Sequence, residues 1–221
     1  MKKIICSFIT LFCLLCAVTV NAAQLSKDTA VAVMDFGTRP GATPAEISLN
    51  NAEYTSSEYI IIRLLERNCF NIMDKDFVMN SLNAENIKTT GIIDPDTAKK
   101  IGALLNTKYI IYGNVVNVSL GENEMQLLGI GGNVCTIKAR MMARVMDVDT
   151  GNILMIAKGE GESKSSYVNL ALGNDVFTAP VIAFGTIGVT QESVHNAIKK
   201  AAYDTVDNLI LRLFKEKKPK K

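Results

Sequence analysis

Few residues in this sequence have the types and spacing that a reactive centre needs. His195 is the only histidine among the 221 residues, and it falls on the polar side of a helical pattern beside Asn196 and Lys199. Catalytic triads and zinc sites need several such groups to converge, and no second histidine, paired cysteines or acidic cluster accompanies it. Serine-hydrolase and phosphate-loop motifs are also absent from the sequence. We therefore predict no catalytic, cofactor-binding or metal-binding residue and no cofactor, and we do not expect an enzyme.

Two weaker patterns have more ordinary explanations. The glycines of residues 129–132 are wrongly spaced for a dinucleotide loop, and no helical pattern follows them, which favours a hairpin tip or a membrane-facing bend. Asp147-Val148-Asp149-Thr150-Gly151 hints at a calcium loop. An EF-hand needs glycine at its sixth position and glutamate at its twelfth, where this chain has Asn152 and Lys158. The second pattern therefore predicts a turn.

The composition is that of a globular protein, with 48% apolar and 21% charged residues. Its formal net charge is +2, but the charges are unevenly placed. The first 23 residues contain two lysines and no acid, and residues 215–221 contain five lysines and one glutamate. A mildly acidic body with a basic tail at 215–221 does not favour nucleic acid as a partner.

The N-terminus indicates export from the cytoplasm. Lys2 and Lys3 precede the uncharged, mostly apolar stretch 4–20, and small residues follow at Ala22 and Ala23. This pattern predicts a secretory signal peptide over residues 1–22, cleaved after Ala22 or Ala23. The alternative is an uncleaved membrane anchor, which is disfavoured because the apolar run is short for a spanning helix.

The cysteines carry two further predictions. Cys6, Cys13 and Cys16 lie inside the signal peptide, and none follows the small residue that lipoprotein processing requires, so we expect a mature protein without a lipid anchor. Only Cys69 and Cys135 remain after cleavage. They leave open one disulfide or two buried thiols, of which the second is favoured because buried cysteine is a common small apolar residue.

Residues 28–214 show no linker or internal repeat, and we interpret them as one domain. The Val-rich run at 29–36 predicts a strand that is buried on both faces, and 136–147 alternates between apolar and polar residues as a strand with one wet face does. The other predicted elements are a helix over about 51–67, a short strand at 70–72, a short helix after Asp74, a helix starting at Asp94-Pro95, a strand over 109–118, a return strand from 153, and a long final helix from Val194 to Leu213. The order β-α-β-α-α-β-β-β-α predicts an α+β fold, a mixed sheet with helices packed on it.

Two inserts between these elements do not resemble core. The first covers 119–135 and the second 167–191, which is uncharged from 176 to 191. Neither is long and apolar enough for a spanning helix, whereas a transmembrane strand needs only about 9–11 residues. A loop or short helix lying on the domain or on a partner subunit is favoured, and membrane insertion of a short hairpin stays open.

Several segments together resemble the CsgG family of curli production assembly and transport components. They are 31–36 (Val-Ala-Val-Met-Asp-Phe), 64–67 (Leu-Leu-Glu-Arg) with Phe70, Met73 and Asp74, 101–103 (Ile-Gly-Ala), 109–115 (Tyr-Ile-Ile-Tyr-Gly-Asn-Val), and 145–154 around Asp147 and Gly151. The resemblance implies a CsgG-like fold, similar also to the N-terminal domain of TolB, in a periplasmic protein that assembles into rings under the outer membrane. In the best-known members two hairpins per subunit, at the places of the two inserts, build a channel that exports unfolded amyloid subunits.

The sequence departs from those channels in two respects. It has no lipid acceptor cysteine, and the loop from Thr38 to Asn51 has none of the aromatic residues that build their constriction. We therefore expect a homo-oligomer that is periplasmic and associated with the outer membrane, and that binds an envelope or secreted protein to assist assembly or secretion. A true export channel subunit and a monomeric accessory to a cell-wall enzyme are the alternatives.

Overall fold

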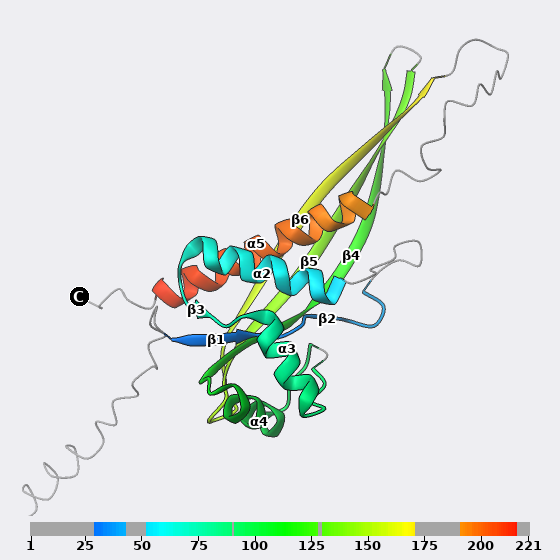
Figure 1. Cartoon of the computed structure of the whole chain (residues 1–221). Helices are drawn as coiled ribbons and strands as arrows, with labels where there is room; N and C mark the ends of the chain where they lie inside the picture. The colour runs from blue at the N-terminus through cyan, green and yellow to red at the C-terminus, as the bar shows by residue number, and fades with distance from the viewer. Residues whose placement is uncertain (1–28, 43–51, 90, 128–129, 171–190, 216–221) are drawn as a thin grey trace, which may run out of the picture.

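The computed structural model describes residues 29–42, 52–89, 91–127, 130–170 and 191–215 (Figure 1). The elements, in chain order, are β1 (Ala30–Val33), β2 (Gly37–Thr38), α2 (Ala52–Arg67), β3 (Asn71–Ile72), α3 (Lys75–Ala84), α4 (Pro95–Leu105), β4 (Tyr109–Leu127), β5 (Ile130–Asp147), β6 (Ile153–Leu170) and α5 (Gln191–Lys215). Apart from the two-residue β2, this is the predicted order, and the α+β class is confirmed.

The strands form one mixed sheet in the order β3-β1-β4-β5-β6, and β2 pairs with β4 beyond the end of β1. The short strand β1 is parallel to both β3 and β4. The long strands β4, β5 and β6 are antiparallel to one another. A short parallel part therefore continues into a long antiparallel meander, with β3 at one edge of the sheet and β6 at the other.

Helices cover the two faces of this sheet unequally. α2 and α5 lie side by side on one face, and α3 and α4 cover only one end of the other (Figure 1). Val31 and Val33 of β1 belong to the core beneath α2 and α5, whereas Ala32 and Met34 belong to the core beneath α3 and α4. The prediction that this strand is buried on both faces is thus confirmed.

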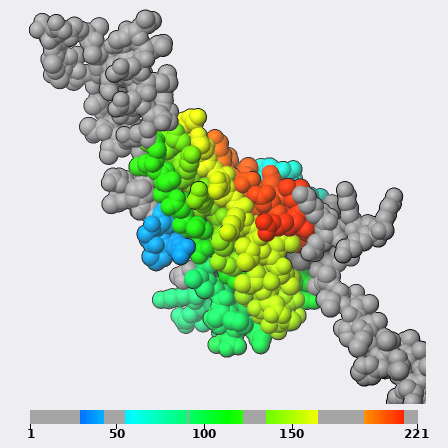
Figure 2. Space-filling model, turned by 180° about the vertical axis from the view of Figure 1, so that it is seen from behind, coloured from blue at the N-terminus to red at the C-terminus, as the bar shows by residue number. Residues whose placement is uncertain are grey.

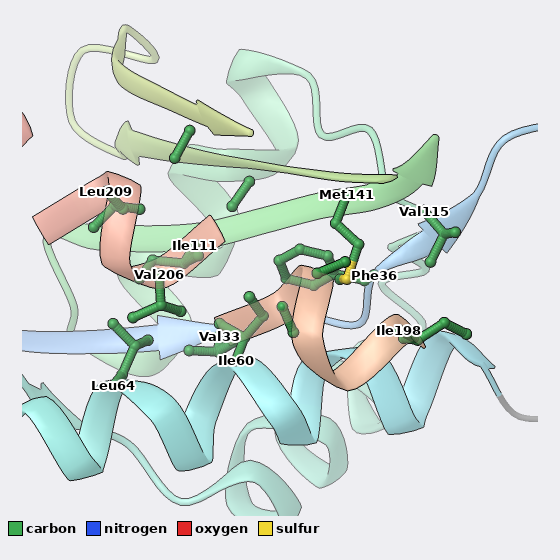
Figure 3. Packing of buried hydrophobic residues seen from close by; sticks show 14 of the residues in the cluster. Val33, Phe36, Ile60, Leu64, Ile111, Val115, Met141, Ile198, Val206 and Leu209 are labelled. Atoms are coloured by element: carbon green, nitrogen blue, oxygen red, sulfur yellow. The ribbon is translucent and has the colours of Figure 1, made fainter. Parts of the chain in front are cut away.

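The larger core lies between α2, α5 and the sheet. Phe36 lies beside Met141 of β5, and Ile60 and Leu64 of α2 approach Val33 from the helix side (Figure 3). All of these side chains are at most 1% exposed. Full burial of side chains of this size stabilises the fold by roughly 1.5–3 kcal/mol each.

Two helix starts were correctly predicted from their capping residues. The Asp74 carboxylate accepts a hydrogen bond from the backbone N–H of Phe77 at 2.8 Å. The Asp94 carboxylate accepts from the N–H groups of Asp96 at 3.1 Å and Thr97 at 3.0 Å. Such side chains satisfy backbone donors that the first helical turn leaves without intrahelical acceptors.

The alternation predicted for 136–147 is confirmed with one correction. Ile137, Met141 and Val145 point into the larger core, whereas Lys138 and Arg140 are exposed. The face that was predicted to be exposed to solvent is buried at both ends of the segment. Thr136 is buried, and Met146 belongs to the core beneath α3 and α4.

The first insert is a β-hairpin rather than the favoured loop or short helix. β4 runs on to Leu127 and β5 begins at Ile130, with pairing maintained as far as Leu127↔Ile130. β6 pairs with β5 up to Leu170, so it includes the first residues of the second insert. The rest of that insert, 171–190, lies outside the described residues. Non-local strand pairing decides these lengths, which local propensity cannot show.

Candidate interaction surface

The residues first considered for chemistry do not converge. His195 is half-buried on α5. Within the described residues, no group of three or more His, Cys, Asp or Glu side chains could hold a metal ion. Cys69 and Cys135 are both buried, and the Cys69 thiol donates to the carbonyl of Arg67. In the same part of the chain, no helix combines the length and apolarity needed to cross a membrane.

The pattern at 147–151 forms the predicted turn between β5 and β6. Oδ1 of Asp147 accepts hydrogen bonds from the N–H groups of Asp149 at 3.1 Å and Thr150 at 3.0 Å. The Thr150 hydroxyl donates to the same oxygen at 3.1 Å. Gly151 has φ +70° and lies against Pro95, where a side chain would be both strained and obstructed. The Asp147 carboxylate therefore stabilises the turn to which it belongs.

The glycines near 130 belong to the hairpin. Gly131 pairs with Gln126 and Gly132 with Met125 in the antiparallel pairing of β4 and β5. Gly129 lies outside the described residues, as do most of the loop at 38–51 and the end of the basic tail, 216–221. A strand follows these glycines where a dinucleotide loop would need a helix.

A partly buried ionic cluster, which the sequence did not reveal, joins α2 and α3 to the segment that follows β1. The ammonium group of Lys75 lies 2.9 Å from Oδ1 of Asp35 and 3.7 Å from Oε1 of Glu58. It also donates to the hydroxyl of Ser57, and that hydroxyl donates to Asp35 at 3.2 Å. A serine beside a lysine resembles a nucleophile with its base. Here Ser57 is fully buried and Lys75 is ion-paired, so the cluster ties the segment after β1 to α2 and α3.

A second ionic cluster holds α2 against α5. Arg63 and Arg67 each donate two hydrogen bonds to the carboxylate of Asp207, with nitrogen–oxygen distances between 2.7 and 3.1 Å. The Arg63 guanidinium also lies over the ring of Tyr203, 4.9 Å from its centroid. Burial opposes ionisation of Asp207, but the hydrogen bonds from the two arginines outweigh it and hold its pKa below the ordinary value.

The Asp207 cluster holds α2 and α5 together on one face of the sheet, and α3 and α4 leave part of the other face uncovered. We call this part the open face. Seen from behind, the strands themselves form the molecular surface beyond α3 and α4 (Figure 2). The open face consists of alternate residues of two strands: Lys138, Arg140, Met142 and Arg144 of β5, and Leu154, Ile156, Lys158, Glu160 and Glu162 of β6.

The end of the open face that lies toward the β4–β5 hairpin is charged. Arg140 pairs with Glu160 at 3.0 Å, and Glu162 lies 3.9 Å from Lys138 and 3.5 Å from Lys164. A shallow groove runs between these side chains and the polar residues Asn117 and Ser119 of β4. Exposed pairs of this kind contribute only about 0–1 kcal/mol each to stability. They affect the specificity of contacts more than the fold.

The opposite end of the open face, next to the turn between β5 and β6, is apolar. Leu154 is 41% and Ile156 is 39% exposed. Ile156 pairs across the strands with Arg144, whose guanidinium lies 5.8 Å from the ring centroid of Tyr112. An apolar patch bordered by charged residues is typical of a surface that contacts another protein. The geometry therefore makes the open face a candidate binding surface on an α+β scaffold.

The comparisons agree with the fold. The sequence matches the family of the curli production assembly/transport component CsgG over residues 18–220, and the chain belongs to this family. Family membership associates the protein with the cell envelope. None of the curated proteins matches the sequence significantly.

Several solved structures are similar to the chain at low identity. The lipoprotein GNA1162 from Neisseria meningitidis is 15% identical, with a TM-score of 0.44, and 62% of this chain covers 84% of that one. The LpoB C-terminal domain from Salmonella enterica is 14% identical, with a TM-score of 0.43 and coverages of 64% and 87%. The protein CT253 from Chlamydia trachomatis is 15% identical, with a TM-score of 0.45 and coverages of 84% and 95%. Similarities at this level carry no argument about function.

Proposed function

We propose that this chain is exported to the periplasm, associates with the outer membrane and assists assembly or secretion at the cell envelope. It acts by binding an envelope or secreted protein and by associating with copies of itself. The observation that supports this most directly is the open face, where an apolar patch beside a charged groove is left uncovered by the helices. Membership in the CsgG family and the predicted signal peptide over residues 1–22 agree with it.

The same proposal assigns no reaction to the protein. Its described titratable clusters, around Lys75 and around Asp207, consist of side chains that satisfy one another and join elements of the fold. A reactive centre would need an accessible nucleophile or a metal with an open position. Binding is thus the activity that the described residues support.

A true export channel subunit is the second candidate. The β4–β5 hairpin favours it, because its paired strands continue past the helices and project from the domain (Figure 1). A hairpin with regular pairing over 119–135 is the element that the family resemblance leads one to expect at this place. A monomeric accessory to a cell-wall enzyme is a third candidate, which no particular feature of the structure favours.

Site-directed photocrosslinking in cells tests the first proposal. A crosslinking residue replaces Ile156 on the open face, and a control replaces Asn196, which is exposed on α5. We expect Ile156 to capture a copy of the chain or an envelope protein, and Asn196 to capture much less. Equal capture at both positions would contradict a role for the open face.

Fractionation separates the three candidates. A mature protein that is soluble without detergent and self-associates would support the proposal. Recovery only from the outer membrane, as a ring of defined size, would establish the channel subunit instead. A monomer by light scattering at high concentration, with no crosslinked partner, would favour the accessory module.

A further inference from the structure

The outer edge of β6 is covered by side chains of α5. Lys200 Nζ donates to the carbonyl of Glu162 at 2.8 Å, and the carboxylate of Asp204 accepts from the N–H of Glu160 at 3.0 Å. Asn208 Nδ2 donates to the carbonyl of Lys158 at 2.9 Å, and Arg212 Nη1 donates to the carbonyl of Ile156 at 2.6 Å. We call these four residues of α5 the ladder. They contact every second residue of β6, in reverse order along the chain.

The spacing of the ladder follows from helix and strand geometry. Four residues of an α-helix rise by about 6 Å. Two residues of a strand advance by about 6.6 Å, and every second residue directs its N–H and C=O groups to the same edge. The helix and the strand therefore advance by nearly the same distance per contact. As a result, positions 200, 204, 208 and 212 of α5 lie opposite positions 162, 160, 158 and 156 of β6, respectively.

The chemistry of the ladder matches the groups that it covers. The three positions that meet a carbonyl carry donors, namely an ammonium, an amide and a guanidinium, and the one that meets an N–H carries a carboxylate. These side chains provide four of the hydrogen bonds that a neighbouring strand would otherwise make. An exposed strand edge without such cover is a template for pairing with another chain.

Two glycines bring the helix close enough for these contacts. A Cβ atom at Gly159 would collide with backbone atoms of Ala201 and Thr205. A Cβ atom at Gly161 would collide with backbone atoms of Ala197 and Ala201. The strand therefore lacks side chains where α5 crosses it, and short polar side chains such as Asp204 reach the edge.

We propose that α5 guards the β6 edge, so that a second copy of this chain cannot extend the sheet along Ile156–Glu162. This protection of the β6 edge by α5 does not depend on the proposed function. It restricts self-association to other surfaces, the open face among them, because one backbone group of each of the residues Ile156, Lys158, Glu160 and Glu162 is already engaged by α5.

The test opens the edge without breaking the helix. A ladder variant carries Lys200→Ala, Asp204→Ala, Asn208→Ala and Arg212→Ala, since alanine has the highest helix propensity. The matched control carries alanine at four exposed positions of the same helix that lie outside the ladder: Gln191, Glu192, Asn196 and Lys199. Sedimentation velocity compares both with the full mature chain at equal concentration, after circular dichroism has verified the fold.

We expect the ladder variant to at least double its weight-average mass relative to the wild type, and the control to match the wild type. Adding Lys158→Pro should return the ladder variant to the wild-type mass. Proline removes an N–H that points away from β5, and it is tolerated on edge strands for this reason. The reversal identifies the β6 edge as the surface that associates.

Two results would overturn the proposal. One is an unchanged mass distribution in a folded ladder variant, and the other is association that persists with Lys158→Pro. Should the fourfold variant fail to fold, Asp204→Ala with Asn208→Ala still exposes the central groups at Lys158 and Glu160, and the same two outcomes apply to it.

Discussion

Asp207→Asn should destabilise the protein by about 2 kcal/mol at pH 7 while leaving its shape unchanged. The carboxylate accepts paired hydrogen bonds from Arg63 and Arg67, and its side chain is 31% exposed. Such paired contacts are the strongest ion pairs, and each is worth about 1 kcal/mol at a partly exposed site. Asparagine retains the shape but loses the charge, and it turns an amide donor toward the arginines.

The lowered pKa of Asp207 determines how the loss of stability in the Asp207→Asn variant changes with pH. The two arginines lower the pKa of Asp207 below its ordinary value of 3.8, against the opposing effect of burial. A carboxylate whose pKa is lowered on folding stabilises the folded state above the pKa of the unfolded chain. This contribution is lost as the pH falls through the folded-state pKa. The difference between wild type and variant should therefore be full at pH 7 and shrink below about pH 4.

Urea unfolding at several pH values measures this difference, and thermal unfolding at pH 7 should show a lower midpoint by about 4–8 °C. Asp149→Asn is the control, because this exposed aspartate forms no ion pair within the described residues. It should leave the unfolding free energy nearly unchanged. An Asp207→Asn difference that is equally large at pH 7 and pH 3 would refute the electrostatic explanation.

Two further comparisons test the ion pair of Lys75 and the packing of α5. Lys75→Met should reduce the free energy of unfolding by about 3 kcal/mol, because it leaves the Asp35 carboxylate without its buried cation; Asp35→Asn in the same chain should recover part of this loss in a denaturant titration. Gly161→Ala should destabilise more than Gly121→Ala in the same assay, because a Cβ collides with the backbone of α5 at the first position and meets its nearest atom at 3.9 Å at the second. Equal losses at the two glycines would show that α5 is not held against β6 as described.

Local patterns explain the parts of the fold that the sequence predicted well. The start of α4 depends on Asp94 and Pro95, which act within one helical turn. The faces of β5 depend on a period of two, and the burial of β1 on a run of small and branched apolar residues. In each case the physical cause lies within a few neighbouring residues, so a single segment contains the information.

The length of β4 and β5 could not be predicted in this way. Gly131, Gly132 and Asn133 are poor strand formers, and they are in a strand because β4 and β6 pair with them on both sides. The open face was partly predictable. The alternation at 136–147 indicated a wet face, but the uncovered apolar residues Leu154 and Ile156 depend on how far α3 and α4 extend over the sheet.

The amino-acid sequence by itself determined the order of elements, their capped starts and the two faces of its amphipathic segments, since these follow from interactions between near neighbours. Only the tertiary structure decided that Arg63 meets Asp207, which lies 144 residues further along the chain, or that α5 closes the β6 edge. Such contacts require distant segments to be brought together first. Their energies depend on distances and burial that exist only in the folded molecule.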